Sequence, residues 1–138
     1  FVNLGGDLRI IGPQPDGSPW RIGIQDPRDP GATVASIDIG RGAMTTSGDY
    51  ERYFELDGRR YCHILNPRTG RPVSYWRSVT VLAPLAIAAG SCSTSAMLKE
   101  ADGLEFLDET GYSFLAIDSQ GNRFRREEGA SAITVDRA

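Results

Sequence analysis

The sequence predicts an α+β domain built mainly from antiparallel strands, with two helices near its C-terminal end. Three observations indicate this fold class. Sixteen glycines and eight prolines in 138 residues favour many short strands joined by turns over long helices. Several segments between those turns alternate apolar and polar residues, as strands with one buried face do. A segment of helical composition, rich in Ala, Met and Leu, comes late in the chain, at residues 86–99.

The expected strands follow one another with short connections through most of the chain. In the first part of the chain they occupy residues 1–4, 8–11, 20–25, 33–39 and 43–47. Further along they occupy residues 52–56, 60–65, 76–83, 112–117 and 122–126. The Asp57-Gly58 pair between two of them is a strong hairpin signal, because both residue types tolerate a positive φ.

Two helices are expected after the strand at residues 76–83. Pro84 lies just ahead of the first helix, where a helix start tolerates proline. The second helix is shorter, with Asp102 as its expected N-cap and Gly111 as the residue that ends it. Residues 1–138 are therefore expected to form a single domain, and residues 128–138 a flexible tail.

Length, charge and cysteine content exclude several classes of protein. A chain of 138 residues is about one domain, large enough to bury a core of its own. A net charge of −3 and a pI near 5.1 argue against a nucleic-acid partner, which favours a basic surface. Two cysteines are too few for a disulfide framework, and one histidine without a Cys-x-x-Cys pair argues against structural zinc. No run approaches the roughly 20 apolar residues of a membrane-spanning helix.

The first residues indicate that the chain continues a longer protein. Residues 1–4 read as the end of a strand, with neither a methionine nor a turn before them. We therefore expect this chain to be a fragment of a larger domain. A targeting segment would then lie in the preceding part.

His63 is the first candidate for chemistry, because it is the only histidine and its ordinary pKa lies near neutrality. It directly precedes a loop punctuated by proline and glycine, at residues 66–72. The alternative is a structural role, since a lone histidine on a strand is more often half-buried and hydrogen-bonded to backbone. The residues alone favour the structural role.

Glycine turns and a helix rich in hydroxyl groups are the other candidates. The segments Gly5-Gly6-Asp7 and Ser47-Gly48-Asp49 could cradle a phosphate with bare backbone amides, although hairpin-rich proteins commonly contain such turns. In the expected helix, hydroxyls could meet a magnesium-bound phosphate, or could serve only close packing. They belong to Ser91, Ser93 and Thr94. That helix has no carboxylate before Glu100 to act as a magnesium ligand.

Arginines are frequent around the central stretch and could offset the charge of a phosphate, or simply be solvated. They are Arg52, Arg59, Arg60, Arg68 and Arg71. Composition and spacing alone therefore indicate an α+β domain with a candidate anion-binding surface.

Four consecutive motifs resemble the ApbE family of FAD:protein FMN transferases. The sequence NLGGD at residues 3–7 is similar to the family's NxGGD segment, and TSGDYERYF at residues 46–54 to its TSGxYERxF segment. HILNPRTGRPV at residues 63–73 resembles the HIxDPxTGxP loop, and residues 78–84 resemble the strand that follows it. The resemblance covers nearly the whole chain, in order, and corresponds to the C-terminal part of the family.

The resemblance implies an ApbE-like, T-fold-like α+β fold built around antiparallel sheet, which binds FAD with Mg²⁺. Members of the family hydrolyse FAD or transfer its FMN part to a threonine hydroxyl of a target protein, releasing AMP. The targets are typically subunits of membrane redox pumps. The family further implies a periplasmic or other extracytoplasmic location, with membrane attachment only through a lipoprotein anchor that lies outside this chain.

The family's site residues are carried over one by one. The resemblance implies that His63 is the base and that Ile64 contacts FAD through its backbone. Thr94 matches the threonine of the family's D-x-x-x-T metal motif. The turns at Gly48 and Gly70 are expected to shape the wall of the FAD pocket.

The chain departs from the family pattern at two positions. The metal-binding aspartate of the D-x-x-x-T motif is Gly90 here, and the loop has Asn66 where the family usually has Asp. Cys62 lies beside the histidine. The segments that make most FAD contacts in the family, and the other metal ligand, lie upstream of Phe1, so we expect this chain to hold only part of the site.

Two functional hypotheses follow. The first is a flavin transferase with His63 as base and Thr94 as metal ligand. The second is a divergent, non-catalytic relative that binds flavin or a partner without transferring FMN, as Gly90 suggests. An unrelated extracellular β-rich binding module fits the motifs least well.

Overall fold

The computed structural model describes residues 1–127 and 133–135. Its strands in the first part of the chain are β1 (Val2–Leu4), β2 (Asp7–Ile10), β3 (Trp20–Gln25), β4 (Thr33–Ile39) and β5 (Gly42–Gly48). Those that follow are β6 (Tyr53–Leu56), β7 (Arg59–Cys62), β8 (Trp76–Ala83), β9 (Ser113–Asp118), β10 (Arg123–Arg126) and β11 (Ile133–Val135). The helices are α1 (Ala86–Lys99), a 3₁₀ turn at Glu100–Asp102 and α2 (Gly103–Thr110).

The described strands form three antiparallel sheets. The largest has the order β1-β2-β5-β8-β9-β10, the second β11-β4-β3, and the third is the β6–β7 hairpin. The α+β fold class predicted from the sequence is therefore confirmed, as are the mainly antiparallel pairing and the two late helices. Agreement extends to the expected hairpin turn, where Asp57 and Gly58 both have positive φ.

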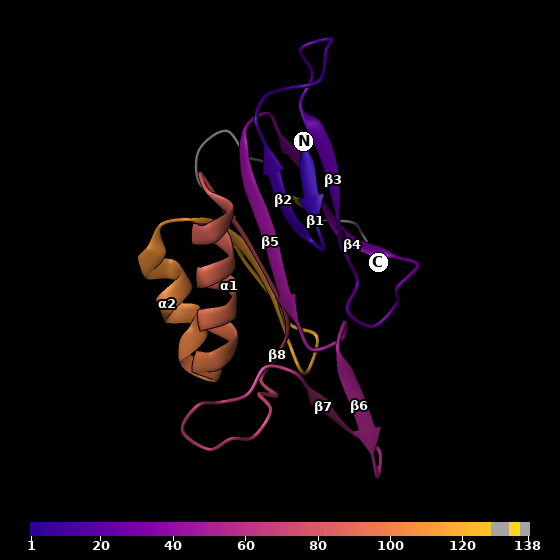
Figure 1. Ribbon diagram of the computed structural model, residues 1–138, viewed down its shortest axis with the longest axis vertical. Helices are drawn as coiled ribbons and strands as arrows, with labels where there is room; N and C mark the ends of the chain where they lie inside the picture. Colours follow the sequence, from indigo (N-terminus) through magenta and orange to yellow (C-terminus); the bar gives the residue numbers. More distant parts are fainter. Residues whose placement is uncertain (128–132, 136–138) are drawn as a thin grey trace.

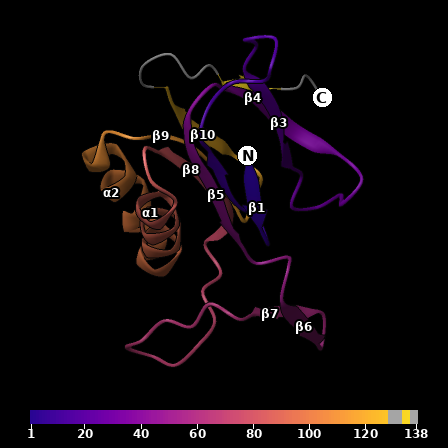
Figure 2. The same cartoon turned by 45° about the horizontal axis from the view of Figure 1, so that its top comes forward.

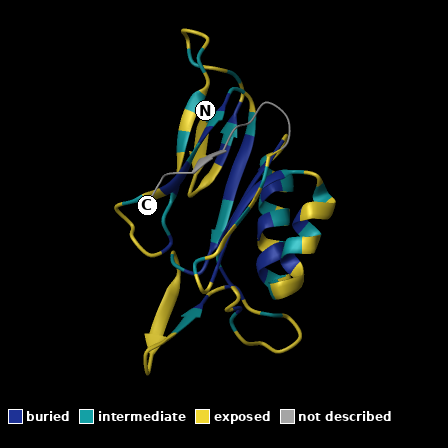
Figure 3. Ribbon diagram, turned by 180° about the vertical axis from the view of Figure 1, so that it is seen from behind, coloured by how far each residue is buried: buried dark blue, intermediate teal, exposed yellow. Residues whose placement is uncertain are grey.

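The elements stack as three layers, with the six-stranded sheet in the middle. Helices α1 and α2 lie side by side on one face of this sheet, and β3 and β4 lie on the other (Figure 1). The β6–β7 hairpin and the loop after β7 extend beyond the end of the layers (Figure 2). Buried residues concentrate in β5, β8 and the inner sides of the helices, whereas β6 is exposed along its length (Figure 3).

Two hydrophobic clusters, one on each face of the six-stranded sheet, form the core. The cluster under the helices includes Trp76, Met97 and Leu107, each at most 1% exposed. The cluster under β3 and β4 includes Ile10 and Ile37, which are fully buried. Successive side chains of a strand point to opposite faces of the sheet, so each central strand contributes apolar side chains to both clusters.

The end of α1 is fixed to the sheet. Glu100 follows the helix with a φ of +51°, which is unusual for a residue with a side chain. Its carbonyl oxygen accepts a hydrogen bond from Trp76 Nε1 at 2.6 Å, and its carboxylate accepts one from the Ser74 backbone N–H at 3.1 Å. These two bonds join the helix end to the segment that leads into β8.

Two local expectations differ from the structure, and a third is met. The strand expected at residues 60–65 ends at Cys62, because the next residues pair within their own loop through a Leu65–Pro72 bridge. Asp102 makes no side-chain cap bond, since the preceding 3₁₀ turn already gives it a helical backbone. Gly111 does end α2, in the left-handed conformation expected for it.

The predicted flexible tail falls mostly outside the described residues. Residues 128–132 and 136–138 are not described. Strand β11 pairs antiparallel with β4, which the sequence analysis does not anticipate. Among the described helices, even α1, with 14 residues, falls short of what is needed to cross a membrane.

Candidate functional site

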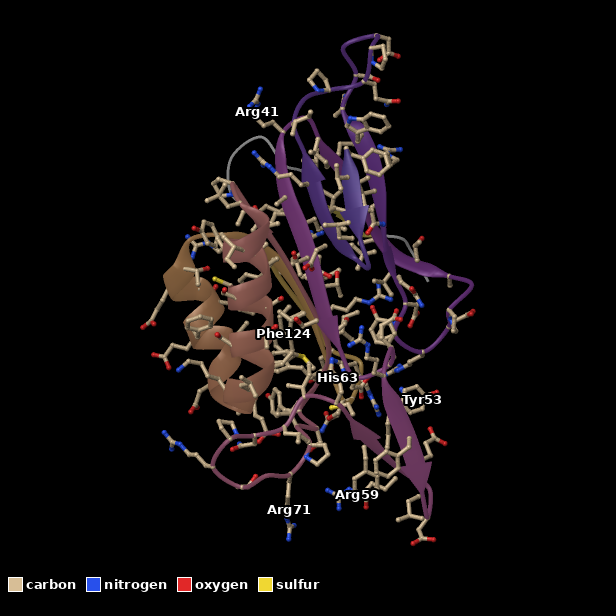
Figure 4. All side chains as sticks on the ribbon, viewed as in Figure 1. Arg41, Tyr53, Arg59, His63, Arg71 and Phe124 are labelled. Atoms are coloured by element: carbon tan, nitrogen blue, oxygen red, sulfur yellow. The ribbon has the colours of Figure 1, made fainter. Side chains whose placement is uncertain are left out.

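A cavity of about 500 Å³ lies where β5 ends, between α1 and the segment that follows β7. Four of the five site residues implied by the resemblance line it: Gly48, His63, Ile64 and Thr94. They come from a strand, a loop and a helix, so the fold brings together residues up to 46 positions apart. Figure 4 shows His63 at this junction, close to the lower end of β5 and above the exposed loop.

His63 is exposed, and its imidazole is oriented by the backbone of the neighbouring strand. Its backbone N–H donates to the Arg52 carbonyl at 3.0 Å, and its Nδ1 lies 3.2 Å from the same oxygen. A carbonyl oxygen can only accept, so Nδ1 carries the proton in the neutral ring, and Nε2 keeps its lone pair. The structural role favoured by the residues alone expected a half-buried ring bonded to backbone: the backbone bond is present, but the ring is exposed. Its geometry suits a general base.

Ile64 has a buried side chain and an available backbone N–H. Its carbonyl accepts from the Val73 N–H at 3.0 Å and from Cys62 Sγ at 3.7 Å. Its own N–H has no hydrogen-bond partner among the described residues, although the residue lines the cavity. The buried Cys62 thiol thus helps to close the loop, and the Ile64 amide remains able to bind a ligand.

Gly70 is the implied site residue that does not line the cavity. It is exposed, has a φ of +66°, and donates its N–H to the Asn66 carbonyl at 2.8 Å. Its conformational freedom therefore serves to close the loop. Asn66, where the family usually has Asp, accepts a hydrogen bond from the Arg68 N–H at 2.9 Å through its side-chain oxygen. An aspartate would make the same turn, so this departure leaves the loop shape intact.

Gly48 was expected to lie in a turn. In the structure it is the last residue of β5. A Cβ at this position would overlap the Tyr50 ring and lie 3.1 Å from the Arg77 carbonyl oxygen. Glycine here lets the half-buried Tyr50 ring fold back against the strand. Burial, with smaller contributions from the charges of Glu51 and Asp49, raises the pKa of Tyr50 to about 12.

Hydroxyl groups from β5 and α1 meet along one side of the cavity. Ser47 Oγ lies 2.8 Å from Ser93 Oγ and 3.0 Å from Thr94 Oγ1. Ser93 is fully buried and also donates to the Gly90 carbonyl at 3.1 Å. Thr94 is exposed, so its hydroxyl can reach a ligand while Ser93 serves packing.

A second groove of about 660 Å³ continues from this hydroxyl cluster along α1. It shares Thr46, Ser47 and Thr94 with the cavity, and its lining also includes Gly90 and Asp7. Both volumes lie within the range of small-molecule sites in proteins. Together, the cavity and the groove form a continuous surface between the helix and the sheet.

Helix α1 on its own does not fit the magnesium ion that the resemblance implies. A hard divalent cation prefers carboxylate ligands, and Gly90 supplies none one turn before Thr94. A Cβ at Gly90 would meet Thr45 Cγ2 at 3.6 Å, which is ordinary contact, so packing does not require the glycine. No group of three or more His, Cys, Asp or Glu side chains suited to a metal occurs within residues 1–127 or 133–135.

The pairing of Ser47 with Thr94 is the feature of the site that was not predicted from the sequence. The Ser47 hydroxyl joins Thr94 from 47 positions away, which only the packing of α1 on β5 decides. The available signal was the run of hydroxyl residues at the end of one strand, matched by a similar run in the helix.

The fold is that of solved proteins named ApbE, and the chain belongs to the ApbE family. The sequence profile of this family matches residues 1–116. In structure, the chain is similar to the ApbE protein of Thermotoga maritima, with a TM-score of 0.82 and 41% identity, over 89% of this chain and 41% of that one. It is also similar to the apo form of the Pseudomonas stutzeri flavinyl transferase ApbE, with a TM-score of 0.70 and 34% identity, over 95% and 40% of the two chains.

Curated relatives carry the name FAD:protein FMN transferase. The protein from Escherichia coli K12 is 39% identical over 128 residues, which are 91% of this chain and 36% of the relative. The protein from Vibrio cholerae is 38% identical over 134 residues, which are 95% and 40% of the two chains. The chain therefore spans less than half the length of these relatives, and it corresponds to their C-terminal part.

Proposed function

We propose that this chain forms part of a flavin transferase, which moves FMN from FAD to a threonine hydroxyl of a target protein and releases AMP. The observation that carries the proposal is His63, which lines the cavity with its Nδ1 held by the Arg52 carbonyl. The printed name of the relatives, FAD:protein FMN transferase, supports this choice of reaction.

In this reaction, the acceptor threonine Oγ forms a bond to the phosphorus of the FMN half of FAD. The bond from that phosphorus to the bridging oxygen breaks, and AMP leaves with the oxygen. His63 Nε2 takes the proton of the threonine hydroxyl as a general base. Such a transfer depends mainly on positioning and on electrostatic stabilisation of the phosphoryl group.

The remaining predicted site residues would bind and orient the flavin and its phosphates. The Ile64 N–H would donate to the flavin, and Gly48, without a side chain, leaves the adjacent wall open. The charge of the pyrophosphate would be offset by Mg²⁺, with Thr94 Oγ1 as one of its ligands. Gly70 would act indirectly, by fixing the loop between Asn66 and Val73.

The partners follow from the same proposal. FAD is the donor, and the acceptor is a protein with an exposed threonine, of the type found in subunits of membrane redox pumps. An extracytoplasmic location, with membrane attachment only through a lipoprotein anchor outside this chain, is part of the proposal. The absence of a nucleic-acid partner stays a prediction from the acidic net charge.

A second function is favoured by one observation, the missing carboxylate at Gly90. A protein that keeps the cavity but binds its cation weakly would hold flavin, or a partner, without transferring FMN. This divergent, non-catalytic relative differs from the transferase in one measurable property, which is covalent modification of the acceptor.

The test is coexpression of the complete protein, including any residues before Phe1, with a threonine-bearing acceptor. The transferase predicts a fluorescent flavin band on the acceptor in a denaturing gel. Replacement of the acceptor threonine by alanine should remove the band. If no band forms while the Escherichia coli relative labels its own acceptor, the transferase proposal is wrong and the binding function is favoured.

His63→Ala tests the assigned base. We expect loss of the flavin band with FAD binding retained, because His63 is exposed and its removal leaves the core intact. Arg71→Ala is the matched control, since Arg71 is exposed on the same loop but does not line the cavity. If His63→Ala loses FAD binding or folding together with transfer, the histidine is structural.

A further inference from the structure

Asp7 lies beside Thr45 on the face of the sheet that α1 covers. Strand β2 pairs antiparallel with β5 from Leu8–Met44 onward, and extending that register by one residue sets Asp7 opposite Thr45. Leu8 and Met44 belong to the core under β3 and β4. Successive side chains alternate between faces, so Asp7 and Thr45 both point to the opposite side, toward the helix.

Thr45 provides an independent sign that a polar group is missing from this groove. It is 4% exposed, and its Oγ1 has no hydrogen-bond partner among the described residues. It lines the groove together with Asp7 and lies against the open side of Gly90, where a Cβ would be 4.0 Å from Oγ1. Buried hydroxyls are nearly always paired, so an unpaired one facing a groove indicates a ligand or water there.

The charge of Asp7 is not offset within the groove. The lining contains no lysine or arginine, and Asp7 is its one carboxylate. The other polar lining groups are mainly hydroxyls, of which those of Ser47 and Thr94 lie 3.0 Å apart. One carboxylate with several neutral oxygen ligands is a donor set for a hard divalent cation, with water completing the coordination.

We propose that Asp7 supplies the carboxylate that Gly90 lacks, so that a divalent cation binds between Asp7 on β2 and the Ser47–Thr94 hydroxyl pair. A Cβ at Gly90 would lie 4.0 Å from Thr45 Oγ1, so an aspartate at this position of the helix would begin next to Thr45. In this chain the carboxylate comes from the sheet, and the absence of a side chain at Gly90 leaves it room. The inference deepens the proposed function, because it names the ligand through which the same site would hold its cation.

The test uses Mn²⁺ as the probe, without flavin or acceptor. Mn²⁺ broadens the amide NMR signals of nearby residues and reports weak sites as well as strong ones. We expect selective broadening at residues 45–47 and 90–94. Asp7→Asn should raise the Mn²⁺ concentration needed for half-maximal broadening about tenfold or more. Excess Mg²⁺ should reverse the broadening in the unmodified chain.

Two further variants separate a metal ligand from a general effect of charge. Asp57→Asn removes a carboxylate from the exposed turn of the β6–β7 hairpin, where asparagine tolerates the positive φ, and should leave the broadening unchanged. Gly90→Asp added to Asp7→Asn should restore it, since the carboxylate returns from the helix side. Restoration would also show that the Asp7→Asn chain remains folded.

The proposal is overturned if Asp7→Asn leaves the broadening as it was. It is equally overturned if no signal near the groove broadens, or if broadening appears only at the acidic surface of α2. Failure of FMN transfer is a different result. A chain that shows Asp7-dependent Mn²⁺ binding but no flavin band keeps this inference and loses the transferase function.

Discussion

The two faces of the six-stranded sheet are filled to different extents. Between the six-stranded sheet and β3–β4 the packing is mainly apolar, with Ile37 fully buried and Ile24 2% exposed, and the buried hydroxyl of Thr80 is paired with that of Thr46 at 2.8 Å. Against the helices it is filled around Trp76 and Leu107, but toward β2 the same face carries the hydroxyls of the groove. One face serves stability alone, whereas the other divides its area between a core and a ligand-accessible surface.

The largest effect expected from this comparison is on the filled face. Ile37→Ala should lower the free energy of unfolding by about 2–5 kcal/mol, because it leaves a cavity among close-packed neighbours. Thr94→Ala, on the hydroxyl side, should cost no more than about 1 kcal/mol, since the side chain is exposed. Urea denaturation of both variants measures the difference. Equal decreases in the free energy of unfolding would mean that the two faces are packed equally closely at these positions.

Gly103, at the start of α2, shows how closely the filled part of the helix face is packed. A Cβ there would overlap the Ala96 carbonyl oxygen and lie 2.9 Å from Trp76 Nε1. Gly103→Ala should therefore destabilise the fold by about 1–3 kcal/mol, although alanine is the better helix former. Thermal unfolding followed by circular dichroism provides the measurement. A more stable variant would show that α2 can move away from Trp76 at little cost.

Gly90, in α1, is the control for Gly103, because it lines the groove on the same face of the sheet. A Cβ at Gly90 meets only ordinary contacts, at 3.6 Å or more. Gly90→Ala should raise the free energy of unfolding by about 0.5–1 kcal/mol, because alanine has the higher helix propensity. The same thermal experiment reports this gain. If both glycine variants lose stability alike, then the groove side of α1 is packed as closely as the other.

A different kind of effect, an alkaline loss of stability, is expected from Tyr50, next to the cavity. Its pKa is raised from 10.0 to about 12, so between these values the unfolded chain loses the phenolic proton while the folded chain keeps it. Stability present below the lower value is therefore lost as pH rises toward the higher one. Tyr50→Phe should remove this component of the loss. Urea unfolding on either side of the lower value, compared between the two proteins, measures it; identical pH profiles would contradict the shift.

Much of the secondary structure could be predicted because its causes are local. The Asp57-Gly58 turn, the helix at residues 86–99 and the end of α2 at Gly111 each depend on propensities that act over a few residues. Strand limits were less predictable: β7 ends at Cys62 because Leu65 finds a partner in Pro72. That pairing depends on the closure of the whole loop.

For the candidate site, the sequence indicates the residues but not which of them lie next to one another. Motif resemblance singles out His63, Ile64, Gly48 and Thr94, and the fold does bring these four to one cavity. It also singles out Gly70, which the fold keeps away from that cavity. The Ser47–Thr94 pair and the position of Asp7 beside Thr45 had no local signal, because strand register and helix packing create them.

By itself, the sequence determined the α+β class, the order of most strands and helices, and the family to which the chain belongs. The tertiary structure decided which face each residue occupies and which distant groups meet. Hydrogen-bond register sets Asp7 against Thr45, and close packing sets Gly103 against Trp76, 27 positions earlier in the chain. Such contacts join segments that have no influence on one another until the sheet has formed, so no local pattern of residues encodes them.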